Sequence, residues 1–363
     1  MNNRLFPLLA FLCCLPVIGI AQQPAAPALA PRPAPAPEPA AAQGGIHLDV
    51  VVTDKAGKPI PGLALGDFTL TDNGRPAKIL SFHAYGGAAA QPGAPVQVVL
   101  LLDTVNLDVM EVSIARGQME QFLRQNGGHL AYPVSIFRIT DDGVDVLNRP
   151  TLDGNALAVQ LHAASTQLRE IHRSAGAWGA AERLDLSLRM LDDVARTEAK
   201  IPGRKLLIWM GHGWPMMDSP NVLMTQKGLD KIFANIVELS TRLREARIAL
   251  YSVSDGMSDT YTHIYEGWLK GVKKADQANP GDLGLKVLAV QSGGRALDPS
   301  NDVAAEIANC IQDAAPYYTL SFDPPPADGP NEYHELKLQI DRPGLAARTS
   351  TGYYDDPHSG LEP

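Results

Sequence analysis

The stretch Val96-Gln97-Val98-Val99-Leu100-Leu101-Leu102-Asp103-Thr104-Val105-Asn106-Leu107 decides the fold of this chain. An apolar run rich in Val and Leu that ends on a carboxylate is typical of a buried strand in an α/β sheet. In such sheets, ligands bind at the carboxyl ends of the strands. Burying a charge is unfavourable, so Asp103 either takes part in function or lowers stability.

Strand and helix patterns alternate after this stretch. We expect strands at Val96–Leu102, Val134–Ile139, Lys205–Met210 and Ile248–Val253. We expect helices at Met110–Arg124, Ala181–Arg196, Leu229–Ala246, Leu283–Gln291 and Val303–Ala314. The pattern predicts an α/β fold, a mostly parallel sheet with helices on both faces.

Short β patterns lie on both sides of this α/β part, and each is too small to bury a good core alone. We therefore predict that the two β units pair into a small sandwich into which the α/β domain is inserted. The predicted divisions are a signal peptide (1–21), an Ala/Pro-rich disordered linker (22–45), an N-terminal β unit (46–85), the α/β domain (96–315), a C-terminal β unit (316–356) and a tail (357–363).

The composition restricts the function classes. The chain has 363 residues and a formal net charge of -9, and it has no run of Lys or Arg. These features argue against nucleic acid and anionic membranes as partners. Arg4, the apolar segment Leu5–Ile20 and the small residue Ala21 have the pattern of a cleaved secretory signal. The mature protein is then secreted or periplasmic, without a membrane span. The alternatives are an uncleaved membrane anchor or a lipoprotein.

The α/β part resembles a von Willebrand factor A (VWA) domain, and the likeness is closest to the VWFA-related domain family of acidobacteria. The stretches that carry it are 98–103 with Asn106, 203–209, 288–296 and 315–322, together with 54–68 in the front β unit. The resemblance covers residues 46–355. It implies a Rossmann-like VWA fold and an extracytoplasmic binding role, and it leaves the ligand open.

The resemblance raises the question of a metal. A VWA metal site uses an Asp-x-Ser-x-Ser loop, a Thr from a second loop and often an Asp from a third, all oxygen ligands for Mg²⁺ or Mn²⁺. Asp103 matches the first position, but Val105 and Leu107 replace the two hydroxyl residues. The second loop, expected in Ser174–Gly179, has no Thr, and Gly211-His212-Gly213 has no carboxylate. We expect no metal and no other cofactor; the alternative is Mg²⁺ or Mn²⁺ in a rewired site at Asp103, Asn106 and Asp108.

Asp103 then has two other interpretations. Its carboxylate accepts hydrogen bonds from the turn that follows, or it pairs with His212 at the same edge of the sheet. Loops 211–221 and 256–268 extend from that edge and carry Trp and Tyr residues, which either form a binding surface or pack against the domain itself. The predicted partner-binding edge consists of Asp103, Asn106, His212, Trp214, Tyr261 and Trp268.

Three functions follow from these residues. The first is a secreted or periplasmic module that binds an unknown extracytoplasmic protein without a metal. The second is a divalent-metal-dependent adhesion protein with a rewired site at Asp103. The third is a hydrolase that uses Asp103 and His212, for which the sequence offers no nucleophile; we therefore expect no enzyme. The sequence identifies neither the partner nor the oligomeric state.

Overall fold

The computed structural model describes residues 45–86, 95–165, 176–215, 224–255 and 263–355. At its centre is a seven-stranded sheet with the order β11-β10-β9-β5-β6-β7, to which β8 adds by pairing with β6. The strands from β11 to β6 are parallel, whereas β7 and β8 run antiparallel to β6. The strand bounds are β5 Val96–Asp103, β6 His129–Thr140, β7 Gly143–Val146, β8 Thr151–Asp153, β9 Arg204–Met210, β10 Ile248–Val253 and β11 Arg295–Ala296.

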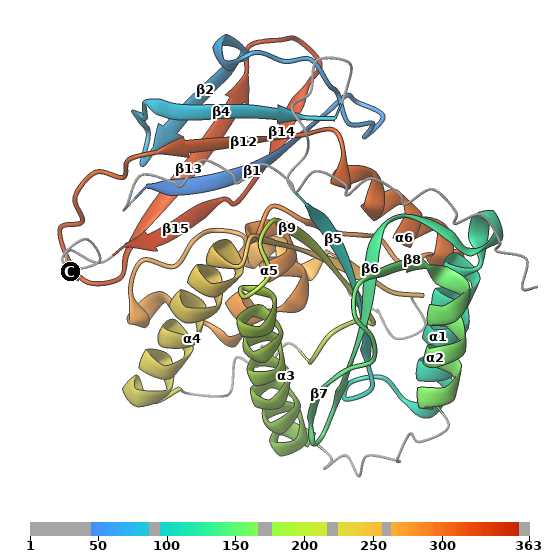
Figure 1. Cartoon of the computed structure of the whole chain (residues 1–363). Helices are drawn as coiled ribbons and strands as arrows, with labels where there is room; N and C mark the ends of the chain where they lie inside the picture. Colours follow the sequence, from blue (N-terminus) through green and yellow to red (C-terminus); the bar gives the residue numbers. More distant parts are fainter. Residues whose placement is uncertain (1–44, 87–94, 166–175, 216–223, 256–262, 356–363) are drawn as a thin grey trace, which may run out of the picture. The chain divides into compact units, whose positions relative to one another are not determined.

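Helices cover both faces of this sheet (Figure 1). The side chains of β5 alternate between two cores: Val98, Leu100 and Leu102 face one, and Val99 and Leu101 face the other. This alternation follows from the two-residue period of a strand and explains why the whole run is apolar. The first core includes residues of α1 (Val109–Leu123), α2 (Gly154–Ser165) and α6 (Val303–Ile311); the second includes residues of α3 (Gly176–Glu198), α4 (Gln226–Glu245) and α5 (Leu285–Gln291).

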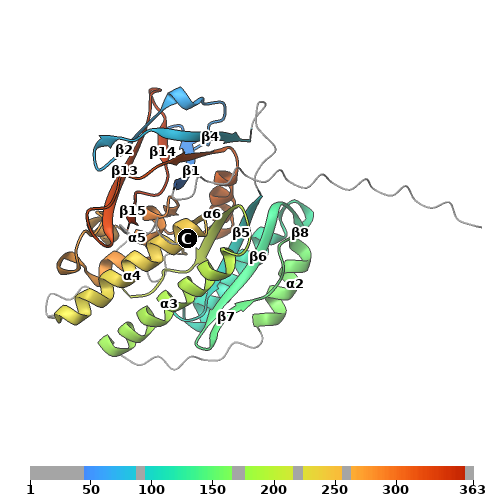
Figure 2. The same ribbon diagram turned by 60° about the vertical axis from the view of Figure 1, so that its left-hand side comes forward.

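Strands from the two ends of the chain form two antiparallel sheets, with the orders β14-β1-β12-β4 and β15-β13-β2-β3. The blue N-terminal and red C-terminal strands are interleaved in Figure 2. Their inner faces share one apolar core, so the two sheets form a sandwich. The bounds are β1 Ile46–Thr53, β2 Phe68–Asp72, β3 Arg75–Pro76, β4 Ile79–Tyr85, β12 Tyr317–Phe322, β13 Glu332–Ile340, β14 Ala346–Arg348 and β15 Gly352–Asp355.

Short 3-10 helices complete the described elements. They are η1 Leu65–Asp67, η2 Gln125–Gly128, η3 Ile264–Trp268, η4 Ala275–Gln277, η5 Pro280–Leu283 and η6 Gln312–Ala314. In the described part of the chain, we find no helix that is long and apolar enough to cross a membrane.

The sandwich packs against the α/β part through both ion pairs and apolar contacts. Arg247, just before β10, forms an ion pair at 2.6 Å with Asp49 of β1. Tyr354 of β15 donates a hydrogen bond to the carbonyl of Val272 at 2.8 Å and packs edge-on against Phe233 of α4. On the α/β part, these contacts lie just before β10, on α4 and at Val272, which follows η3.

The predicted fold class is confirmed, because a mostly parallel sheet with helices on both faces is inserted between strands that form a small sandwich. Elements that the sequence patterns did not predict include α2, β7, β8 and β14. In α2, Leu157 and Leu161 are buried while Val159 is 63% exposed. Apolar residues on both faces of the helix hide its 3.6-residue period.

Candidate functional site

Asp103 ends β5 in the middle of the sheet and is fully buried. Its Oδ1 accepts hydrogen bonds from the backbone N–H groups of Val105 at 3.0 Å and Asn106 at 2.9 Å. Its Oδ2 accepts hydrogen bonds from Asn106 Nδ2 at 2.9 Å and from Trp209 Nε1 at 3.0 Å. Burial raises the pKa of Asp103, while these hydrogen bonds act in the opposite direction. The carboxylate therefore organises the loop that follows β5.

The residues after Asp103 point into the protein. Val105 is 1% exposed and Leu107 is 6% exposed, so both belong to apolar cores. Asn106 is also buried, and its Nδ2 donates a second hydrogen bond, to Ser187 Oγ of α3 at 3.0 Å. The loop is therefore held to the sheet by Asp103 and to α3 by Ser187, while its apolar residues Val105 and Leu107 pack in the cores.

Asp108 has a different role from Asp103. It is exposed and is the N-cap residue of α1: its Oδ1 accepts a hydrogen bond from the N–H of Glu111 at 2.8 Å. Glu111 Oε2 in turn accepts a hydrogen bond from the N–H of Asp108 at 2.7 Å, which completes a capping box. The carboxylate of Asp108 is thus directed to the backbone of its own helix.

His212 is half-buried in the loop after β9. Among the described residues, the hydrogen bonds to Asp103 come from Val105, Asn106 and Trp209, and His212 is not a donor to this carboxylate. Of the expected second loop, residues 176–179 are in the first turn of α3, and residues 174 and 175 lie outside the described part.

The two tryptophans of the predicted edge pack against the domain itself. Trp214 is 4% exposed; its ring lies edge-on to Trp209 at 5.5 Å, and its Nε1 donates to the carbonyl of Leu283 at 3.0 Å. Trp268, in η3, is half-buried, with its ring directly against the backbone of Gly281. Tyr261 lies outside the described residues. The structure thus groups Asp103 with Asn106, and places Trp214 in the core behind them.

Other apolar side chains are exposed at this edge, and the sequence analysis missed them. In a parallel sheet, a helix that connects two strands begins at the carboxyl edge of the sheet and runs back toward the amino edge. Half of the most exposed large apolar residues of the described chain occupy such positions: Val109 and Met110 at the start of α1, Trp178 in the first turn of α3, Met224 before α4 and Ile264 in η3. The pair Val109-Met110, directly after an N-cap residue, could have indicated exposed apolar side chains in the sequence, because the first turn of a helix is commonly solvated.

The exposed groups of this edge are mainly apolar. Among the described residues, no group of three or more His, Cys, Asp or Glu side chains is arranged to hold a metal ion. The polar groups of Asp103 and Asn106 are directed inward, whereas the exposed groups are apolar side chains on helix starts. Such side chains contribute to association by losing contact with water.

No protein-family model matches the chain, and no curated protein matches it. Among solved structures, the chain is similar to the human COPII-coat protein Sec24c at 9% identity, with 73% of this chain and 44% of that chain covered and a TM-score of 0.34. The SpRpn10 VWA domain matches at 12% identity over 60% of this chain and 94% of that one, with a TM-score of 0.27. The TFIIH p34 N-terminal domain matches at 12% identity over 60% and 97%, with a TM-score of 0.29. The chain thus spans less than half of the Sec24c chain, and membership of the acidobacterial family stays a prediction.

Proposed function

We propose that this chain is a protein-interaction module that binds its partner at the carboxyl edge of the central sheet, without a metal ion and without catalysis. The observation that carries the proposal is the set of exposed apolar side chains on the helix starts of that edge, Met110 and Trp178 above all, at 63% and 87% exposure. Exposed apolar side chains at one edge of a folded domain favour aggregation. Their presence is explained if a partner protein covers them.

The geometry around Asp103 supports metal independence. A divalent cation of the Mg²⁺ class takes six oxygen ligands in near-octahedral geometry. The four hydrogen bonds to Asp103 occupy both carboxylate oxygens, and buried Val105 and Leu107 bring carbon atoms where ligand oxygens are needed. These residues do not fit the metal. The alternative, a rewired site with Asn106 and Asp108, requires Asp108 to leave its hydrogen bond to the N–H of Glu111. Within the described residues, Asn106 Oδ1 is a buried acceptor without a hydrogen-bond partner, and Asn106 Nδ2 is held by Asp103 and Ser187.

We further propose that the module works outside the cytoplasm, as a secreted or periplasmic protein, because Arg4, the apolar segment Leu5–Ile20 and Ala21 have the order of a cleaved signal. The proposal against catalysis rests on His212 and Asp103: within the described residues, the hydrogen bonds to Asp103 come from Val105, Asn106 and Trp209 and not from His212.

Capture experiments with the mature protein test the binding edge. Envelope extract is passed over the immobilised protein with and without a chelator, and the captured proteins are compared with those retained by Met110→Ser and Trp178→Ser. Val159→Ser is the matched control, because Val159 is as exposed as Met110 but lies in the middle of α2. We expect a partner that is retained with chelator and by the control, and lost from the edge variants. Equal retention by all variants would contradict the proposed edge.

Calorimetric titration with Mg²⁺ and Mn²⁺ tests metal independence. We expect no saturable heat at millimolar concentrations. Tight binding to one site that disappears in Asp103→Ala would favour the metal-dependent alternative.

A further inference from the structure

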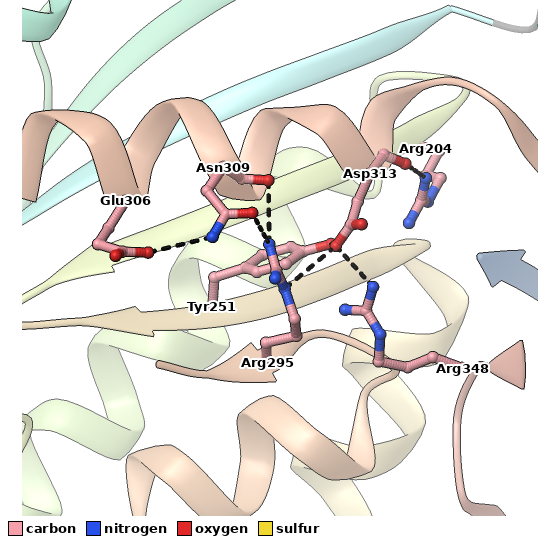
Figure 3. Close-up of polar contacts among 7 residues, drawn as sticks. All are labelled: Arg204, Tyr251, Arg295, Glu306, Asn309, Asp313 and Arg348. Carbon is pink, nitrogen blue, oxygen red and sulfur yellow. Dashed lines mark hydrogen bonds and ion pairs between the residues drawn. The ribbon is translucent and has the colours of Figure 1, made fainter. Parts of the chain in front are cut away.

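A second buried carboxylate lies where the sandwich meets the α/β part. Asp313, in η6, is 1% exposed, and its Oδ2 accepts hydrogen bonds from Tyr251 Oη at 2.9 Å and Arg348 Nη2 at 2.8 Å. The same oxygen lies 3.4 Å from Nε of Arg295 (Figure 3). The residues come from β10, β11, β14 and η6, so one carboxylate oxygen connects the edge of the central sheet to the sandwich.

Positive charge exceeds negative charge in this cluster. Besides Arg295 and Arg348, Arg204 donates to the backbone carbonyl of Asp313 and lies over the ring of Tyr317 at 4.9 Å. The second carboxylate in the view, Glu306, accepts a hydrogen bond from Asn309 Nδ2, and Asn309 in turn accepts one from Arg295 (Figure 3). Three guanidinium groups thus lie near the carboxylates of Asp313 and Glu306, and Asp49, which forms an ion pair with Arg247, also attracts Arg204.

Donor groups are left over on the two arginines that share Asp313. Within the described residues, Arg348 Nη1, Arg295 Nε and Thr349 Oγ1 are buried atoms without a hydrogen-bond partner. A buried donor without an acceptor is unfavourable, because it has lost its hydrogen bonds to water. The side chains of Arg295 and Arg348 are 25% and 23% exposed, so other atoms of both side chains contact solvent although these donor atoms are buried.

We propose that a small oxyanion of the phosphate class binds between Arg295 and Arg348 and accepts hydrogen bonds from Arg348 Nη1 and Thr349 Oγ1. Guanidinium groups bind such anions well, because several N–H donors meet several oxygens. The anion supplies the acceptors that the unpaired donors lack and neutralises the excess charge. It also adds a link between β14 of the sandwich and β11 of the central sheet. This inference is independent of the proposed partner-binding edge, which lies at the strand ends.

The test is a titration of the full mature protein with inorganic phosphate at constant ionic strength, followed by calorimetry and by thermal unfolding. We expect saturable binding at one site and a Tm that rises with phosphate and then levels off, because a ligand of the folded state stabilises it. Sulfate should act similarly, and chloride or acetate at the same ionic strength should act weakly.

Arg348→Lys keeps the positive charge but loses the planar set of guanidinium N–H donors. We expect it to weaken phosphate binding at least tenfold. Arg342→Lys is the matched control, because Arg342 makes a two-bond pair with Asp67 within the sandwich; it should bind phosphate like the wild type. If Arg348→Lys does not fold, Thr349→Val replaces it, with an expected loss of threefold or more. Absence of saturable binding to the wild type, an equal response to chloride, or unchanged affinity in the folded variant would overturn the proposal.

Discussion

Asp103 and Asp313 are both buried carboxylates, but the groups around them differ in charge. Asp103 accepts four hydrogen bonds, all from neutral groups: two backbone N–H groups, an amide and an indole. Asp313 contacts the guanidinium groups of Arg295 and Arg348 and the hydroxyl of Tyr251. The neutral donors around Asp103 all have their hydrogen bonds to its carboxylate. The two guanidinium groups around Asp313 have more N–H donors and more positive charge than one carboxylate can pair with.

Asp103 thus has a structural role, whereas Asp313 has neighbouring donors that are still able to bind a ligand. Both oxygens of Asp103 accept hydrogen bonds from neighbouring groups, and the proposed binding edge therefore relies on the exposed helix starts. The surroundings of Asp313 have buried donors without a partner on arginine side chains that are themselves partly exposed. The most prominent carboxylate of the sequence is therefore not the one whose neighbours favour a small ligand.

The largest effect is expected for Asp103→Ala. It removes the acceptor of four buried hydrogen bonds, of whose donors only Asn106 Nδ2 keeps another partner, so we expect the free energy of unfolding to fall by about 3–5 kcal/mol. Urea denaturation measures the loss. The loss should be the same in excess chelator and nearly independent of salt, because the donors are neutral. A loss that appears only with Mg²⁺ present would identify Asp103 as a metal ligand and break the comparison.

A smaller but salt-dependent loss is expected for Asp313→Asn. The variant keeps the shape of the side chain and leaves the charges of Arg295 and Arg348 without their shared carboxylate. We expect a loss of about 2–3 kcal/mol at low ionic strength that shrinks as salt is added. Denaturation at two salt concentrations, next to Asp103→Ala, checks this. The same salt response in both variants would remove the distinction between the two sites.

The sequence predicted the fold well, because long periodic patterns decide it. The run that ends at Asp103 has buried side chains on both faces, and α4 has a clear apolar stripe, so the structure confirms both elements. Weak periods were missed, as in α2, where an exposed Val159 breaks the stripe. The turn after Asp103 was also one of the two interpretations that the sequence offered, and its hydrogen bonds are present.

The side-chain environment could not be predicted in the same way. Whether Trp214 faces solvent or the core depends on Trp209 and on the carbonyl of Leu283, which lies far along the chain. The cluster at Asp313 likewise joins residues from β10, β11 and β14, whose spacing in the sequence carries no signal. Contacts between distant segments decide such sites, and local patterns do not contain them.

Asp282 is a third buried carboxylate, with fewer donors than Asp103 and no arginine among its hydrogen-bond partners in the described chain. It is 5% exposed, and in η5 its Oδ2 accepts a hydrogen bond from the N–H of Asn279. Burial raises the pKa of Asp282 to about 6, above its ordinary 3.8, because this one neutral donor offsets only part of the desolvation. The folded state then binds the proton more tightly than the unfolded state. Stability should fall by roughly 2 kcal/mol as the pH rises from 4 to 7, and stay lowered above that range.

Asp282→Asn should abolish this pH dependence and stabilise the protein at pH 7, because an amide keeps the acceptor for Asn279 without a charge. Thermal unfolding between pH 4 and pH 8 measures both proteins. Parallel pH profiles of wild type and variant would mean that Asp282 is solvated well enough to ionise normally.

The smallest effect is expected for Asp108→Ala, which tests an exposed carboxylate with a single backbone donor. Losing an N-cap lowers the free energy of unfolding by about 1 kcal/mol. Asp302→Ala is the matched control, because Asp302 caps α6 through the N–H of Ala305 at 3.0 Å, as Asp108 caps α1 through Glu111 at 2.8 Å. Both losses should be equal and unaffected by Mg²⁺. A loss at Asp108 that changes with Mg²⁺, while the loss at Asp302 does not, would mean that Asp108 binds an ion together with Asn106, so that the edge around Asp103 is not closed to a metal after all.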